Sequence, residues 1–95
     1  MHLTTSIAGI PHRKPNLAAV LVGDEVTLVP EPDNAFDPAA IKVMHNDNHL
    51  GYIPRTETSM FQPPYFPLYV IDVQPSRKWK EVYISTQAPE PIIAD

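Results

Sequence analysis

Six short runs of the chain are rich in apolar, β-branched and aromatic residues, which alternate with polar residues in several of them. Turn-forming residues such as Pro, Gly, Asn and Asp separate most of these runs. A period of two is typical of a strand that has one face in a core. Val26 and Leu28 should therefore face inward, and Lys42 should point away from the buried side of its strand. The expected strands are residues 4–10, 25–30, 41–43, 50–53, 65–73 and 82–85.

Helix signals are confined to short segments. Asp37 and Pro38 have the composition of an N-cap and a first helical position, so a short helical turn is expected there. Residues 55–62 favour a short helix, because the two prolines that follow would end it. Residues 45–48 have the composition of a hairpin turn. With so little helix, the chain is expected to form an all-β or β-rich barrel.

Composition sets the size and the class of the protein. The 95 residues suffice for one domain with one core, expected over residues 1–87, and residues 88–95 should form a loosely held tail. Twelve prolines against three glycines argue against long helices. Because the chain has no cysteine, disulfide bonds and cysteine-based metal sites are excluded.

The formal net charge of -4 narrows the range of partners. Phosphate contacts supply the sequence-independent part of nucleic-acid affinity, so an acidic domain is a poor general polyanion binder and would need a local basic patch. No apolar run approaches about 20 residues, and no apolar signal segment follows Met1. We therefore expect no association with membranes and a soluble, cytoplasmic protein.

Most of the side chains that could bind a ligand or take part in a reaction lie in the stretch from Val29 to Arg55. Asn34 and Asp37 can close and cap local turns, and Phe36 can plug the core. Alternatively, the ring of Phe36 stacks on a base, which contributes about 1–3 kcal/mol, and Asp37 accepts a hydrogen bond from a ligand hydroxyl. Arg55 either binds a phosphate or forms a salt bridge with Glu57 or another carboxylate. The residues alone leave these alternatives open.

Metal binding and catalysis find little support. His45 and His49 flank the expected hairpin turn, with Asp47 between them, whereas a zinc site normally takes three or four protein ligands. No metal and no cofactor are therefore expected. Asp37 and His12 could form a carboxylate–imidazole pair, but no nucleophile, base and orienting group accompany them. We do not expect the chain to be an enzyme.

A longer motif runs through the centre of the chain. It reads Glu-Pro-x-Asn-x-aromatic-Asp-x-x-Ala-Ile-x-Val from Glu31, followed by a hairpin and Gly-Tyr-Ile-Pro-Arg ending at Arg55. This pattern resembles the HIRAN domain, and residues 8–13 resemble the first strand of that family and the turn after it. The resemblance covers residues 4–85. It implies a mostly β fold, a small modified β-barrel (OB/SH3-like) of about six strands with one or two short helices.

The resemblance also implies a binding site. Helicase-attached members of the family capture the 3′ end of single-stranded DNA. By position in the motif, Asp37 would read the free 3′-hydroxyl, and Phe36 would be the adjacent aromatic. Tyr52 and Arg55 would lie on the wall that contacts base and phosphate, and His12 would take the place of a stacking aromatic.

Arg13 and Asn34 complete the implied nucleic-acid-binding set. Arg13 stands where helicase-attached members have a second aromatic, and Pro11 stands where they have a basic residue, so a less aromatic pocket is expected. The implied function is a nucleic-acid-binding module that recognises single-stranded DNA ends in repair or replication-fork processing, with a helicase or nuclease as protein partner. The alternative is a protein-interaction adaptor without nucleic-acid binding, which the acidic balance and the Pro-rich loops favour.

Overall fold

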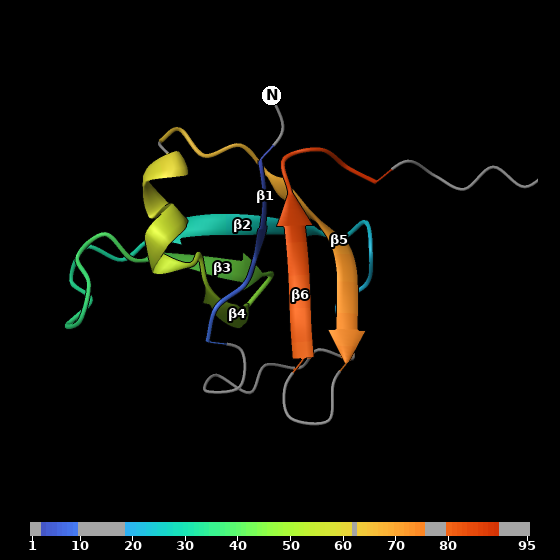
Figure 1. Cartoon of the computed structure of the whole chain (residues 1–95), viewed down its shortest axis with the longest axis horizontal. Helices are drawn as coiled ribbons and strands as arrows, with labels where there is room; N and C mark the ends of the chain where they lie inside the picture. The colour runs from blue at the N-terminus through green and yellow to red at the C-terminus, as the bar shows by residue number, and fades with distance from the viewer. Residues whose placement is uncertain (1–2, 10–18, 62, 76–79, 90–95) are drawn as a thin grey trace, which may run out of the picture.

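Six antiparallel strands dominate the part of the chain that the computed structural model describes, which is residues 3–9, 19–61, 63–75 and 80–89 (Figure 1). The strands form one sheet in the order β1-β6-β5-β2-β3-β4. A 3₁₀-helix, η2, follows β4. The elements are β1 (Thr4–Ser6), β2 (Glu25–Pro30), β3 (Ile41–His45), β4 (Asn48–Tyr52), η2 (Arg55–Met60), β5 (Leu68–Pro75) and β6 (Lys80–Ser85).

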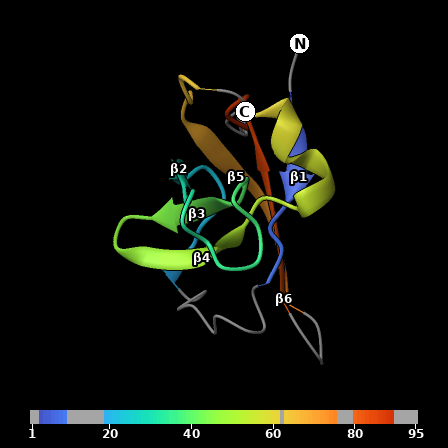
Figure 2. The same ribbon diagram turned by 90° about the vertical axis from the view of Figure 1, so that its left-hand side faces the viewer.

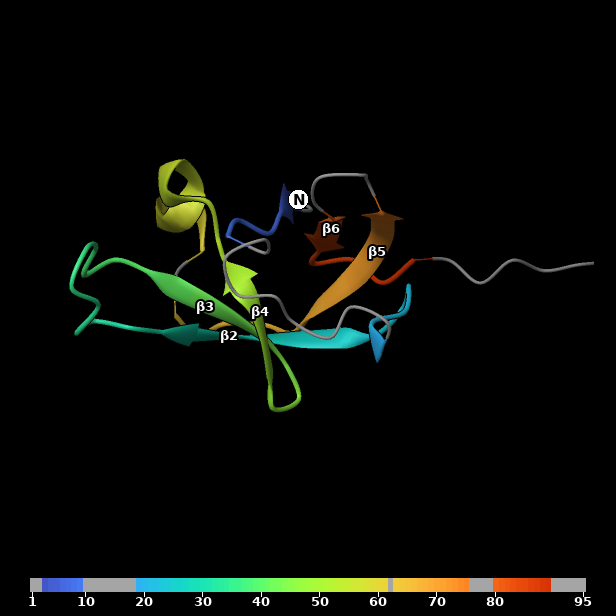
Figure 3. The ribbon, with the colours of Figure 1, turned by 90° about the horizontal axis from the view of Figure 1, so that it is seen from below.

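The sheet curls until its two edge strands meet. The backbone N–H of Ala8 donates to the carbonyl of Tyr52 at 2.8 Å, and the N–H of Tyr52 donates to the carbonyl of Ala8 at 2.9 Å. Ala8 follows β1 and Tyr52 ends β4, so this pair joins opposite edges of the sheet. Figure 3 shows β3 and β4 on one side of the curl and β5 and β6 on the other, with β2 running below both, and Figure 2 shows β1 beside β6. The resulting curled half-barrel confirms the predicted β-rich class.

Apolar side chains from strands β2 to β6 fill the inside of the half-barrel. The alternation predicted from the sequence is confirmed, because Val26 and Leu28 are 1% and 5% exposed while Lys42 is half-buried. Burial of apolar surface is the main favourable contribution to folding. The core consists of Ile7, Val20, Val26, Leu28, Ile41, Val43, Leu50, Ile53, Phe61, Leu68, Val70, Val82 and Ile84.

The β3–β4 hairpin contains a bulge near its middle. Val43 pairs with Gly51, but the next residue of β3, Met44, pairs with His49. Leu50 is therefore the extra residue, and its side chain is fully buried. A bulge of this kind re-aims the side chains beyond it.

Gly51 allows β4 to lie directly against the segment that follows β1. A Cβ atom at Gly51 would overlap the carbonyl oxygen of Ala8 and would lie 2.8 Å from the Cγ2 atom of Ile7. By contrast, a Cβ at Gly9 would have Tyr52 as its nearest neighbour, at 4.0 Å, and Gly9 instead adopts a positive φ of 80°. The glycine required for close packing of the two sheet edges is thus in β4.

The short helical turn predicted at Asp37 and Pro38 is present only as a single turn, without a helix. These residues form a single turn, in which the N–H of Ala40 donates to the carbonyl of Asp37 at 3.0 Å. Strand β3 begins at Ile41, so too few residues follow Pro38 to complete a helical turn with i→i−4 bonds.

Three other predicted elements were too long. The strand predicted over residues 4–10 is, among its described residues, a strand over Thr4–Ser6 only. The helix predicted over residues 55–62 ends at Met60, because Phe61 adopts an extended conformation and buries its ring in the core. The strand predicted from residue 65 begins at Leu68. Pro67 precedes it, and proline lacks the N–H needed for a ladder hydrogen bond.

Several predictions fall on residues outside the described part of the chain. These are the roles of His12 and Arg13 and the end of the tail at 90–95. Within the described residues, no helix is both long enough and apolar enough to cross a bilayer.

Candidate nucleic-acid interface

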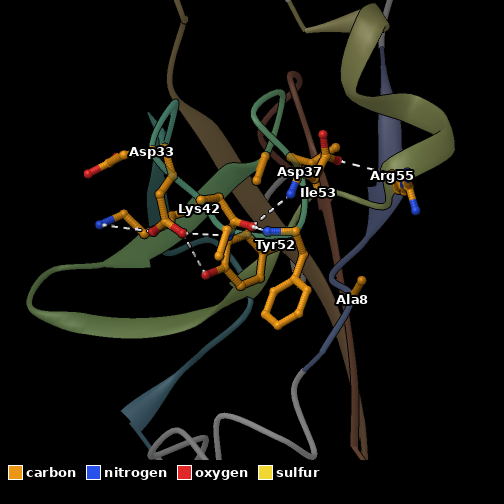
Figure 4. A pocket seen from close by; sticks show the side chains of 12 residues that line it. Ala8, Asp33, Asp37, Lys42, Tyr52, Ile53 and Arg55 are labelled. Carbon is orange, nitrogen blue, oxygen red and sulfur yellow. Dashed lines mark hydrogen bonds and ion pairs between the residues drawn. The ribbon is translucent and has the colours of Figure 1, made fainter.

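A hollow of about 760 Å³ opens between the loop that joins β2 to β3 and the end of β4 (Figure 4). The loop supplies acidic and aromatic side chains, and the strands supply Lys42 and Tyr52. The lining residues are Ala8, Glu31, Asp33, Asn34, Ala35, Phe36, Asp37, Ala40, Lys42, Tyr52, Ile53 and Arg55. Five of the seven residues predicted for the nucleic-acid site therefore line one cavity.

Asn34 shapes the loop. Its Oδ1 atom accepts hydrogen bonds from the backbone N–H groups of Phe36 and Asp37, both at 2.9 Å. The N–H of Glu31 donates to the carbonyl of Ala40 at 2.9 Å, which closes the base of the loop. Asn34 therefore closes the loop, as predicted from the sequence, and it fixes the backbone that carries Phe36 and Asp37.

Phe36 projects from this loop with 93% of its surface exposed. The interpretation of Phe36 as a plug of the core is therefore wrong. Because the backbone of Phe36 is held by Asn34, the ring is presented to solvent from a hydrogen-bonded loop. An exposed aromatic face beside a cavity is suited to stacking on a flat ligand.

Asp37 and Arg55 face each other across one end of the hollow (Figure 4). The Oδ1 atom of Asp37 accepts the N–H of Ala39 at 2.9 Å, so Asp37 caps its turn as expected. The Oδ2 atom lies 3.9 Å from the Nε of Arg55. Glu57, the partner suggested for Arg55, instead accepts a hydrogen bond from the Thr5 hydroxyl at 2.7 Å. The Arg55 side chain is 83% exposed, so the Asp37–Arg55 pair is loose.

Tyr52 forms the inner wall of the hollow and is half-buried. Its hydroxyl donates to the Oε1 of Glu31 at 3.1 Å, and the edge of its ring meets the ring of His49 at a centroid distance of 5.0 Å. Tyr52 thus lies at the cavity surface and not in the core.

Glu31 and Lys42 were missed as site residues. Glu31 Oε1 accepts a hydrogen bond from Asn34 Nδ2 at 2.6 Å, and Glu31 Oε2 lies 3.7 Å from the Nζ of Lys42. The bond from Asn34 is the largest cause of a pKa of Glu31 below its ordinary value, and the bond from Tyr52 and the charge of Lys42 add to it. The signal that could have identified Lys42 is its cross-strand pairing with Tyr52. This pairing becomes evident only when the register of the β3–β4 hairpin is known.

The family model of the HIRAN domain matches residues 2–65, about two thirds of the chain. The chain belongs to the HIRAN domain family. The match ends before β5 but contains every residue that lines the hollow. HIRAN domains are in general nucleic-acid-binding modules. No curated protein and no solved structure matches the chain.

Among the described residues, the charges that line this HIRAN pocket are nearly balanced. Three carboxylates line it there, those of Glu31, Asp33 and Asp37, against the two cations Lys42 and Arg55. Each cation is near a carboxylate, at 3.7 Å for Lys42 and 3.9 Å for Arg55. A phosphate entering this HIRAN pocket must therefore compete with a carboxylate for each cation.

In the β3–β4 hairpin of this HIRAN domain, the imidazole rings of His45 and His49 are each in contact with an oxygen atom. His45 Nε2 lies 2.9 Å from Asp24 Oδ2, and His49 Nε2 lies 2.9 Å from the carbonyl of Gly51. Among the described residues, no three His, Cys, Asp or Glu side chains gather closely enough to hold a metal ion.

Proposed function

We propose that this HIRAN domain binds the 3′ end of a single DNA strand, with the free 3′-hydroxyl in the hollow beside Asp37. The observation that carries this proposal is the combination of an exposed Phe36 ring and the Asp37 carboxylate on one hydrogen-bonded loop. A terminal nucleotide offers a flat base next to a hydroxyl, which matches this pair of groups. Base–aromatic stacking of this kind contributes about 1–3 kcal/mol.

Asp37 is suited to a hydroxyl because of its hydrogen bonds. Its Oδ1 is engaged by the N–H of Ala39, while Oδ2 has only the loose contact to Arg55 among the described groups. In the proposal, the 3′-hydroxyl donates to Oδ2. A carboxylate repels a terminal phosphate, so the same residue discriminates against phosphorylated ends.

Arg55 and Lys42 would bind the phosphates that lie upstream of the terminal sugar. Both side chains line the hollow and both are partly exposed. A guanidinium can take two phosphate oxygens at once, whereas an ammonium acts as a point charge. Arg55 is therefore proposed as the directional contact and Lys42 as the weaker one.

The test is fluorescence anisotropy with labelled single strands that end in a 3′-hydroxyl or a 3′-phosphate. We expect the hydroxyl end to bind at least about tenfold tighter, because hydrogen bonds to charged groups contribute about 1.5–3 kcal/mol. The variant Asp37→Asn retains an acceptor for the N–H of Ala39 but loses the charge, so it should narrow this ratio. Equal binding of both ends by the unmodified protein would refute the role of Asp37.

We further propose that such binding serves DNA repair or replication-fork processing in the cytoplasm, together with a helicase or nuclease that acts on the same ends. Free 3′ ends are the product or the substrate of both classes of enzyme. Co-purification of the domain with a helicase or nuclease would test this setting.

A protein-interaction adaptor is the second candidate function. It is favoured by exposed apolar side chains outside the hollow, of which Phe66 and Met60, at 73% and 49% exposure, line one smaller cavity. An adaptor predicts no oligonucleotide binding even at low salt, so the anisotropy experiment separates the two functions.

A further inference from the structure

We propose that Glu31 is the positioning residue of the pocket, and that its Oε1 atom sets the distance between the loop that carries Phe36 and the wall formed by Tyr52. This inference rests on the proposed function, because the spacing matters if a base lies between these groups. It concerns a residue that would not itself need to touch the nucleic acid.

Tyr52 depends on Glu31 for the orientation of its ring. The backbone of Tyr52 is fixed by two hydrogen bonds to Ala8 and by its pairing with Lys42. The side chain remains to be fixed, and the bond from its hydroxyl to Glu31 Oε1 at 3.1 Å does this from the loop side. The ring of His49, which meets Tyr52 edge-on, limits its movement on the strand side.

Phe36 depends on the same oxygen through Asn34. The Nδ2 of Asn34 donates to Glu31 Oε1 at 2.6 Å, and this leaves Oδ1 facing the N–H groups of Phe36 and Asp37. An amide turned the other way would present hydrogen atoms to these two N–H groups. Glu31 therefore adds to these two N–H groups in favouring the amide orientation that holds both ligand-facing residues.

The backbone of Glu31 keeps the loop closed whatever its side chain does. Its N–H donates to the carbonyl of Ala40 at 2.9 Å, and its carbonyl accepts the N–H of Asn34 at 3.0 Å. The side chain is part-exposed and lies outside the core. Removing the carboxylate should therefore disturb the pocket without unfolding the domain.

The first readout needs no nucleic acid. Amide hydrogen exchange is measured by NMR on the free protein and on Glu31→Ala, Glu31→Gln and Asp47→Asn. We expect Glu31→Ala to speed exchange at Phe36 and Asp37 by about tenfold, while Val43 in β3 is unchanged. Glu31→Gln retains an acceptor oxygen and should restore slow exchange. Asp47→Asn removes one exposed charge at the hairpin tip and should match the unmodified protein.

The second readout is affinity for a single strand with a free 3′-hydroxyl. Glu31→Ala should weaken binding by about tenfold, and Glu31→Gln should recover most of the loss, since it conserves both hydrogen bonds to the acceptor. Unchanged exchange at Phe36 and Asp37 in Glu31→Ala would overturn the positioning role. If exchange responds as expected but the unmodified protein binds no strand, the positioning role stands and the proposed function fails.

Discussion

At the scale of single residues, the loop between β2 and β3 combines ordered backbone with an exposed apolar side chain. Asn34 holds the N–H groups of Phe36 and Asp37, yet the ring of Phe36 is 93% exposed. Removing such a ring has little effect on the core, because it contacts little of it. Its contribution should therefore be visible in binding and not in stability.

The substitution Phe36→Ala tests this separation. We expect affinity for a single strand to fall by about 1–3 kcal/mol, the range measured for base–aromatic stacking, with a melting temperature close to that of the unmodified protein. The matched control is Phe66→Ala, which removes a ring that is 73% exposed and lies outside the hollow. Anisotropy titrations and thermal unfolding report the two quantities. Equal loss of affinity in both variants would exclude a specific role for Phe36.

The turn-forming roles of Asn34 and Asp37 could be read from the sequence because their bonds span only two or three residues. The roles of Glu31 and Lys42 could not. Glu31 meets Tyr52 21 residues away along the chain, and Lys42 faces Tyr52 only in the register that follows the bulge at Leu50. Such contacts require the tertiary structure.

At the scale of elements, the pocket depends on the contact between the segment after β1 and strand β4. Ala8 and Tyr52 exchange two backbone hydrogen bonds, and Gly51 leaves room for the carbonyl of Ala8. Gly9 also lies next to this contact, but only Gly51 meets a neighbouring backbone, that of Ala8. Which of two glycines meets a neighbouring backbone depends on how the sheet curls, and the alternation of side chains does not specify this.

The substitution Gly51→Ala should open this contact. Its Cβ would meet backbone that cannot move aside, so we expect a loss of about 1–3 kcal/mol in the free energy of unfolding. At about 4–8 °C per kcal/mol, this gives a clear drop in melting temperature. Strand affinity should also fall, because Tyr52 shifts with β4.

The contrasting variant is Gly23→Ala. Gly23 has a positive φ of 97°, and a Cβ atom added there would meet nothing within 4 Å, so the substitution should cost about 1–2 kcal/mol through backbone strain alone. It lies away from the hollow and should leave strand affinity unchanged at temperatures where the protein is folded. If Gly51→Ala behaved like Gly23→Ala in both measurements, the junction would not support the pocket.

At the scale of the whole molecule, two carboxylates make the stability of the fold depend on pH. The pKa of Asp24 is lowered, chiefly by the N–H of Leu21 and then by His45, and the pKa of Glu31 is lowered, chiefly by Asn34. A group whose pKa is lower in the folded than in the unfolded chain stabilises the fold above its unfolded pKa. That stabilisation is lost as the pH falls through the folded pKa.

We therefore expect the melting temperature to decline below about pH 4.5, the ordinary pKa of a glutamate side chain. Glu31→Gln cannot titrate at residue 31, so its melting temperature should depend less steeply on pH between about 3 and 5. Thermal unfolding at intervals across this range and up to neutral pH measures both curves. Parallel curves would mean that Glu31 contributes nothing to the acid dependence.

With a net charge of -4, the molecule must hold an anionic strand through few cations. The logarithm of affinity for a single strand falls with the logarithm of salt by about 0.7 for each phosphate that a cation neutralises. Lys42 and Arg55 together then predict a slope of about -1.4.

Lys42→Gln should reduce the slope to about -0.7, whereas Phe36→Ala should lower affinity and keep the slope, because stacking releases no counterions. A slope much steeper than about -1.4 in the unmodified protein would require further cations. Arg13 is then the first to substitute, since the resemblance to the family predicts it for this site. A slope near zero would mean that the strand is held without its phosphates, which removes the proposed roles of Lys42 and Arg55.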